Sequence, residues 1–154
     1  MGLESSFTLL RDIGSLQLNA QEEVRFSIDA YRGYRYVSVR KFLLNEILPM
    51  PTQQGVTLSP ELVRVLVPVV LALPQDATQL KLGEVGKFAK RPGICVVVSI
   101  VEAGTVRGLE LRQWEEDKGF TTKGILLPLS QWDVVRKLFA DTLAAIDETP
   151  DVDF

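Results

Sequence analysis

The sequence contains no histidine and a single cysteine, Cys95. Without histidine, the chain has no imidazole to act as a general base, metal ligand or pH switch, which excludes most catalytic triads and zinc sites. With one cysteine, no internal disulfide can form, so a disulfide-stabilised secreted scaffold is excluded. Cys95 lies in an apolar stretch and is expected to be a small buried residue.

Long hydrophobic runs are also missing. The longest, Leu62 to Leu73, is interrupted by Arg64 and Pro68 and falls short of the roughly 18 residues that a membrane span needs. The N-terminus lacks the basic-then-apolar pattern of a signal peptide. We therefore expect a soluble intracellular protein with no membrane partner, located in the nucleus of a eukaryote or in the cytoplasm or nucleoid of a bacterial or viral host.

The chain has no excess of positive charge. Its 154 residues include 17 Lys and Arg against 20 Asp and Glu, which gives a net charge of -3 and a pI of about 5.1. These totals argue against a strongly basic nucleic-acid or membrane binder. The distribution is uneven, however, because residues 141–154 carry only acidic charges, whereas residues 25–41 carry five basic residues and one acid. An acidic tail behind a body with basic patches is one interpretation, and ordinary solvated surfaces are the other.

Two segments of the sequence resemble each other. YVSVRKF (36–42) and GVTLSPELV (55–63) in the first half match GLELRQW (108–114) and GILLPLSQW (124–132) in the second. Arg40 aligns with Arg112 at an offset of 72, and Gly55 aligns with Gly124 at an offset of 69. The difference falls in a polar loop, where length changes are tolerated. The pattern indicates an internal repeat.

Each repeat is expected to hold four strands and a helix. An α+β fold follows, with two β-β-β-β-α repeats (1–75 and 76–147) forming a pseudo-symmetric intrachain dimer, helices packed between or behind antiparallel sheets, and an acidic tail at 148–154. Ser59 and Ser130 are the expected helix caps. The expected strands are 6–12, 22–31, 34–44, 53–58, 80–90, 93–102, 105–115 and 120–127, and the expected helices are 60–73 and 130–147.

Helix 60–73 is apolar nearly all round, so we expect it to be covered on two sides, by its own sheet and by the helix of the other repeat. In the strands, alternation puts Tyr34, Tyr36, Ser38, Arg40 and Phe42 on one face and Val37 and Val39 on the other. Arg112 and Trp114 take the corresponding face in the second repeat. An outward row of rings and arginine suits a platform for stacking unpaired bases, although such residues also simply favour strands.

The second repeat, LRQWEEDKGFTTKGILLPLSQW (111–132), resembles the positive cofactor four (p15) transcriptional coactivator family, with its arginine, its aromatic residue, the pair Lys123–Gly124 and Trp132. The first repeat, VRKFLLNEILPMPTQQGVTLSPELV (39–63), keeps the arginine and the glycine but has Gln54 in place of lysine and Val63 in place of tryptophan. The resemblance implies a β-β-β-β-α module that works as a dimer and binds single-stranded DNA, a module that the related Pur and Whirly proteins also use.

The sequence and the resemblance together predict a sequence-tolerant binding protein for single-stranded DNA or RNA that acts in transcription, replication or recombination. Lys118 and Lys123, in the loop before the last strand, match lysines that the family uses on the nucleic-acid backbone. The candidate nucleic-acid-binding residues are Arg25, Tyr34, Tyr36, Arg40, Phe42, Lys87, Lys90, Arg112, Trp114, Lys118 and Lys123.

The C-terminal ETPDVDF looks like the tips with which single-strand-binding proteins recruit replication and repair partners, which makes Asp151, Asp153 and Phe154 a candidate partner-binding tail; an ordinary disordered end is the other interpretation. A protein-interaction module of Whirly-like fold, without nucleic-acid binding, is the alternative function. Glu115, Glu116 and Asp117 form an acidic group that in principle suits a divalent ion, but no phosphate loop, triad or ligand spacing accompanies it. We therefore expect no enzyme, metal or cofactor, and a monomer with pseudo-dimeric repeats or a higher homo-oligomer.

Overall fold

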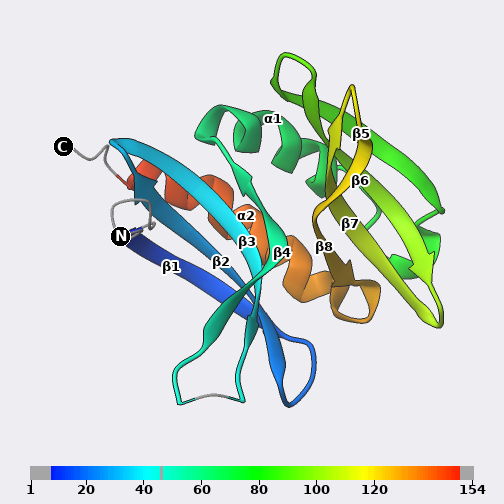
Figure 1. Cartoon of the computed structure of the whole chain (residues 1–154). Helices are drawn as coiled ribbons and strands as arrows, with labels where there is room; N and C mark the ends of the chain where they lie inside the picture. The colour runs from blue at the N-terminus through cyan, green and yellow to red at the C-terminus, as the bar shows by residue number, and fades with distance from the viewer. Residues whose placement is uncertain (1–7, 46, 150–154) are drawn as a thin grey trace.

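A computed structural model describes residues 8–45 and 47–149 of the chain and contains two four-stranded antiparallel sheets, each followed by a helix (Figure 1). In both sheets the strands lie side by side in chain order. This arrangement confirms the predicted α+β fold of two β-β-β-β-α repeats. The first repeat contains β1 (Thr8–Gln17), β2 (Glu22–Tyr31), β3 (Tyr34–Leu43), β4 (Met50–Leu58) and α1 (Pro60–Leu71). The second contains β5 (Gly83–Arg91), β6 (Ile94–Ala103), β7 (Val106–Glu115), β8 (Gly119–Pro128) and α2 (Trp132–Glu148).

The strand registers repeat with the two offsets expected from the sequence. Arg40 of β3 lies opposite Gly55 of β4, and Arg112 of β7 lies opposite Gly124 of β8. Each arginine is followed by the same irregularity in pairing, a β-bulge that lies before Phe42 in the first sheet and before Trp114 in the second. Because a bulge re-aims the side chains around it, the two arginine–aromatic pairs are presented in the same way.

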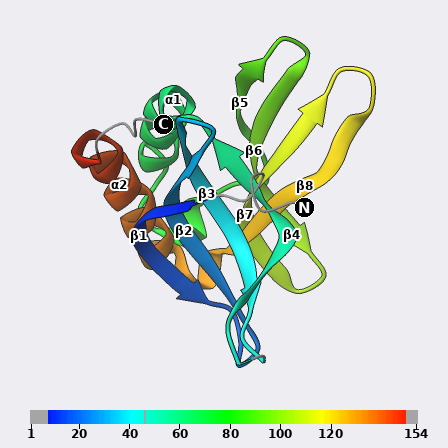
Figure 2. The same ribbon diagram turned by 60° about the vertical axis from the view of Figure 1, so that its left-hand side comes forward.

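The helices are exchanged between the repeats. Helix α2, from the second repeat, lies along β1 and β2 of the first sheet, whereas α1 contacts α2, β3 and the second sheet's β5 (Figures 1 and 2). Gly14 in β1 permits the close approach of α2, because a Cβ atom there would lie 2.7 Å from Cδ2 of Leu138. Phe139 of α2 packs edge-to-face on Phe26 of β2, with ring centroids 5.4 Å apart. One continuous core therefore joins the two repeats.

Side chains of α2 also complete the C-terminal end of α1. The last carbonyl groups of a helix lack partners within the helix, and no glycine ends α1. Instead, the Arg136 guanidinium donates to the carbonyl oxygens of Leu71 (3.3 Å) and Leu73 (3.1 Å). The indole N–H of Trp132 donates to the carbonyl oxygen of Pro74 at 2.9 Å. A cation at this end of α1 also complements the helix dipole.

Some local expectations are confirmed, and others were wrong in detail. The Ser59 hydroxyl accepts the backbone N–H of Leu62 at 3.1 Å and caps α1, as expected. Ser130 does not cap α2, because it lies in a short 3-10 turn (Leu129–Gln131) that precedes the helix. Helix α1 is covered on two sides, as expected, by β3 of its own sheet and by α2, while Val65 is 55% exposed. Strand β1 continues to Gln17 rather than ending at residue 12. Neither helix, within residues 8–45 and 47–149, is long and apolar enough to cross a membrane.

Candidate nucleic-acid interface

The side of the first sheet that faces away from the helices carries a cation stacked on an aromatic ring. Strand alternation and pairing put Arg25, Asp29, Tyr36, Arg40 and Phe42 on this side, which we call the first outward face. The Arg25 guanidinium lies 4.6 Å from the centroid of the Phe42 ring and forms an ion pair with Glu23. The expected outward row of arginine and aromatic side chains is thus present on this sheet.

The second sheet presents an analogous pair from different strands. Lys87 of β5 places its Nζ 4.0 Å from the centroid of the Trp114 ring. Both residues lie on the face that carries Arg112, which we call the second outward face, together with Phe120, which lies opposite Trp114 in the β7–β8 pairing. Phe120 is 63% exposed. Sequence reasoning missed it, although its place in GFTTKG, opposite Trp114 across a hairpin, was a usable signal.

Arg40 and Arg112 take part in matching structural contacts. Nη1 of Arg40 donates to the carbonyl oxygen of Thr52 at 3.0 Å, and Nη1 of Arg112 donates to that of Thr121 at 2.9 Å. The Arg112 guanidinium lies directly over Gly124, where an added Cβ would be only 2.6 Å from its central carbon. Each arginine therefore fixes the neighbouring strand with one N–H group, and Nη2 of Arg112 also pairs with Oε2 of Glu110 at 3.3 Å.

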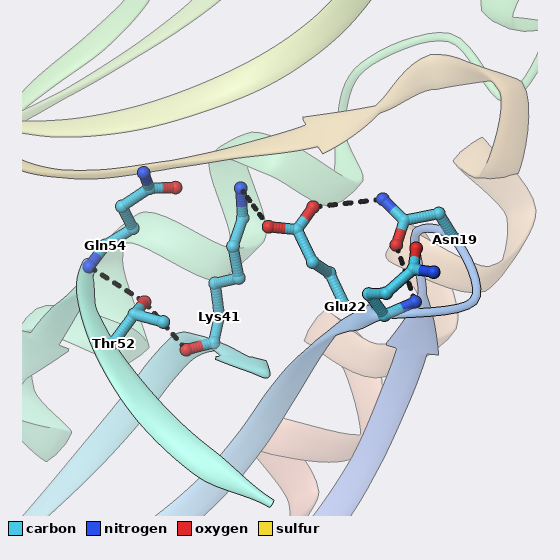
Figure 3. A network of polar contacts seen from close by, with 6 residues as sticks. Asn19, Glu22, Lys41, Thr52 and Gln54 are labelled. Carbon is cyan, nitrogen blue, oxygen red and sulfur yellow. Dashed lines mark hydrogen bonds and ion pairs between the residues drawn. The ribbon is translucent and has the colours of Figure 1, made fainter. Parts of the chain in front are cut away.

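A polar network fixes the end of the first sheet next to Arg40 (Figure 3). The Thr52 hydroxyl donates to the carbonyl oxygen of Lys41 (2.9 Å) and accepts the backbone N–H of Gln54 (3.1 Å). Nζ of Lys41 lies 3.6 Å from Oε2 of Glu22, whose other oxygen accepts the Asn19 side-chain amide at 3.0 Å. In the second repeat the Thr121 hydroxyl makes the equivalent bonds to residues 113 and 123. These contacts hold each bulge in place.

Three predicted lysines lie away from the outward faces. Nζ of Lys90 donates to Oε1 of the buried Gln113 at 3.2 Å, on the opposite side of β7 from Trp114. Lys123 lies within β8, not in the loop before it, and alternation from Gly124 puts it on the same inner side as Lys90. Lys118, in the β7–β8 turn, lies 3.6 Å from Glu115. The candidate residues of the second repeat are thus divided between two sides of the sheet.

Burial, together with the positive charges of Arg91 and Lys123, lowers the pKa of Lys90 to about 8, while the charge of Glu115 acts in the opposite direction. A buried ammonium without a full counter-charge is destabilised relative to the neutral amine. Lys90 therefore releases its proton at a lower pH than an exposed lysine does.

The first outward face is hollowed into a groove of about 510 Å³. Burial raises the pKa of Asp29 in this groove, an effect that its hydrogen bond from Ser27 and the charge of Arg40 oppose. Burial lowers the pKa of Arg40, and Asp29 partly offsets that change. The first outward face thus holds acids among its arginines. The lining residues come from all four strands: Leu9, Asp12, Arg25, Ser27, Asp29, Ser38, Arg40, Phe42 and Pro51.

The remaining predicted residues occupy separate positions. Tyr34 and Tyr36 lie near the β2–β3 turn with ring centroids 6.5 Å apart, and Tyr34 is largely exposed. Arg91 ends β5 and is exposed. Cys95 is half-buried rather than buried. The tail residues Asp151, Asp153 and Phe154 lie outside the described residues. Within the described part of the chain, no group of three or more His, Cys, Asp or Glu side chains is placed to hold a metal ion.

Comparison with known proteins gives only distant likenesses. No protein-family model matches the chain, and no curated protein matches it. Among solved structures, the chain is similar to WHY1 from Arabidopsis thaliana, with 8% identity over 93% of this chain and 90% of that one and a TM-score of 0.42. It is also similar to the plant transcriptional regulator PBF-2, with 9% identity over 93% and 87% of the two chains and a TM-score of 0.36. Likeness at this level carries no conclusion about activity, and the resemblance to the positive cofactor four family stays a prediction.

Proposed function

We propose that this protein binds single-stranded DNA or RNA with little sequence preference, through the outward faces of its two sheets. The observation that supports this most directly is the repeated pairing of a ring with a cation, Phe42 with Arg25 and Trp114 with Lys87, at 4.6 and 4.0 Å. Phe42 and Trp114 occupy aligned positions after the same bulge in the two repeats. The duplicated chain therefore presents two similar platforms.

These platforms combine the two elements that single-strand binding requires. An unpaired base can stack on an exposed ring, which contributes about 1–3 kcal/mol per base, while a neighbouring cation attracts the phosphate backbone. Duplex DNA keeps its bases stacked inside the helix, so it offers the rings no comparable partner. Because every base has a flat face, such binding is tolerant of sequence.

The direct test is fluorescence anisotropy with matched single-stranded DNA, single-stranded RNA and duplex DNA over a series of salt concentrations. We expect single strands to bind more tightly than duplex, and the logarithm of the association constant to fall linearly with the logarithm of salt concentration. Failure of every single strand to bind at low salt would reject the proposal.

Lys87→Gln is the sharpest cationic variant, with Lys137→Gln as its control. Lys87 contacts the ring of Trp114, whereas Lys137 lies on the surface of α2 and pairs with Asp141 at 2.7 Å. Both substitutions remove one positive charge. We expect Lys87→Gln to weaken binding and to reduce the salt slope by about 0.7 per lost phosphate contact, and Lys137→Gln to leave the slope unchanged. Equal effects of the two substitutions on binding would show that binding depends only on the net charge of the protein.

We further propose that the protein acts inside the cell, in transcription, replication or recombination, and that its acidic tail recruits protein partners. The support is the composition of the tail, Asp151, Asp153 and Phe154 with no basic residue. Truncation after Thr149 tests this role. Because the tail's negative charge competes with nucleic acid for cations, we expect the truncated protein to bind single strands more tightly at low salt and to lose its partners in pull-down experiments.

One observation favours the alternative of a protein-interaction module. The connection between β3 and β4 exposes Ile47 completely and Leu48 to 75%, and apolar side chains gathered at the surface often mark interaction sites. Replacing Ile47 and Leu48 with serine distinguishes the two functions. We expect single-strand binding to persist in this variant, whereas a protein that works only through this loop would lose its partner complex and would bind no oligonucleotide in any form.

A further inference from the structure

We propose that the groove on the first outward face is a subsite that selects one guanine base of the bound strand. This inference rests on the proposed function and gives it a single position of sequence preference. At about 510 Å³, the groove is within the roughly 300–1,000 Å³ of small-molecule sites. The Phe42 ring, with Arg25 against it, is part of its lining, together with Ser27 and Ser38, which lie opposite each other on β2 and β3.

The carboxylate of Asp29 is the group that gives the groove its selectivity. It is half-buried, and Oδ1 accepts the Ser27 hydroxyl at 3.0 Å. Within the residues that the structure describes, no cation lies within ion-pair distance of it. An ionised carboxylate has two oxygens and about four acceptor positions, so Asp29 keeps the capacity to accept further hydrogen bonds. A ligand with two adjacent N–H donors would stabilise this partly desolvated charge.

Guanine is the base that offers such a pair of donors. Its ring N1–H and its exocyclic amino group lie side by side, whereas the Watson–Crick edges of adenine, cytosine and thymine offer no two adjacent N–H donors. On its other edge guanine presents two acceptors, O6 and N7, which arginine binds more often than any other side chain does. Arg40, which also lines the groove, uses Nη1 for the Thr52 carbonyl oxygen and retains further N–H groups.

The second repeat lacks the acid and one of the two serines of this groove. At the offset of 72, the position of Asp29 is occupied by Val101 and that of Ser38 by Glu110, whose carboxylate pairs with Arg112 at 3.3 Å. The side chain of Leu126 lies over Gly108, so that an added Cβ at Gly108 would be 2.4 Å from it. The Leu126 side chain therefore fills the space that corresponds to the groove, and the carboxylate of Glu110 is already paired with Arg112. We infer one guanine subsite per chain, next to two sequence-tolerant platforms.

The test compares thymidine oligonucleotides of about 16 nucleotides that carry one central dG, dA, dC or deoxyinosine, each titrated by anisotropy. A single substituted position keeps the strand unfolded. We expect the dG strand to bind about tenfold more tightly than the all-thymidine strand, as one good bidentate contact predicts. Deoxyinosine, which lacks the exocyclic amino group, is expected to lose most of that gain.

Asp29→Asn assigns the preference to the groove, because the amide replaces one acceptor oxygen with a donor at nearly constant shape. We expect this variant to bind the dG and all-thymidine strands equally, with affinity for the latter retained or improved because a negative charge is gone. Asp141→Asn, on the surface of α2, removes the same charge and should keep the tenfold preference. A preference for dG that persists in Asp29→Asn would overturn the assignment.

The failure of this subsite and the failure of the proposed function give different results. If all strands bind but dG confers no preference, the subsite is refuted and single-strand binding stands. If no strand binds, guanosine monophosphate alone is titrated: binding that Asp29→Asn abolishes supports a guanine site without strand binding, and absence of binding refutes both.

Discussion

Removing the two aligned rings is the most demanding test of the proposed interface. Trp114 lies on the outward side of β7 and Phe42 on the outward side of β3, and neither belongs to the buried core. Replacing either with alanine therefore leaves the fold intact and removes one stacking partner, a loss of about 1–3 kcal/mol. At 1.4 kcal/mol per factor of ten, this corresponds to a roughly 5- to 150-fold weaker association.

The two losses should add, because Phe42 and Trp114 lie on different sheets and contact different cations, Arg25 and Lys87. We expect Phe42→Ala/Trp114→Ala to weaken single-strand binding by about 2–6 kcal/mol in total. Anisotropy with a labelled single strand measures this directly. Val65→Ala, which removes exposed apolar surface from α1, is the control, and thermal unfolding verifies that each variant is folded.

Intrinsic tryptophan fluorescence is an independent measurement of base stacking. The chain has two tryptophans, and Trp132 is buried in the core, so Trp114 is the tryptophan on which a bound base can stack. We expect single strands to quench the wild-type emission and to leave that of Trp114→Ala unchanged. Wild-type affinity in the double variant, or an equal loss in Val65→Ala, would refute the stacking mechanism.

Three further outcomes are expected. Since the pKa of Lys90 is lowered to about 8 in the folded chain, the unfolded chain holds this proton more tightly, and the free energy of unfolding should rise between about pH 8 and 10 in wild type but not in Lys90→Gln. Phe139→Ala removes the ring packed on Phe26 and should lower the free energy of unfolding by about 3–5 kcal/mol in urea titrations. Gly124→Ala places a methyl group against the Arg112 guanidinium and should destabilise the protein by about 1–3 kcal/mol, with Arg112→Ala in the same chain relieving most of that cost.

Much of the strand pattern was predictable because its signals are local. Strand alternation in β2 and β3 and the glycine of their turn define two ten-residue strands, and Gly33 adopts the positive φ of 83° that such a turn requires. The repeat itself was visible because the arginine, the glycine and the intervening polar loop recur in the same order. Ser59 followed by Pro60 sufficed to place the start of α1, since a cap acts within one turn of helix.

The features that the sequence did not reveal depend on contacts between distant segments. Leu9 and Asp12, three residues apart on β1, face the same groove because the pairing of β1 with β2 has an irregularity between Leu9 and Arg11. Arg40 fixes β4 through the carbonyl oxygen of Thr52, which the bulge brings within reach. Ser130 resembled a helix cap, but the packing of the Leu129–Gln131 turn moved the start of α2 beyond it. The local spacing of residues in the sequence predicts none of these contacts.

Because the helices are exchanged between the two sheets, the stability of each half depends on the other. Neither sheet keeps a covered apolar side without the helix that the opposite half provides, so fragments cut between α1 and β5 should become stable only when mixed. A symmetric pair of identical chains would have to accept every surface substitution twice. Fused into one polypeptide, the halves share a scaffold yet are free to diverge in what they expose, and the contrast between Asp29 and Val101 shows such a divergence.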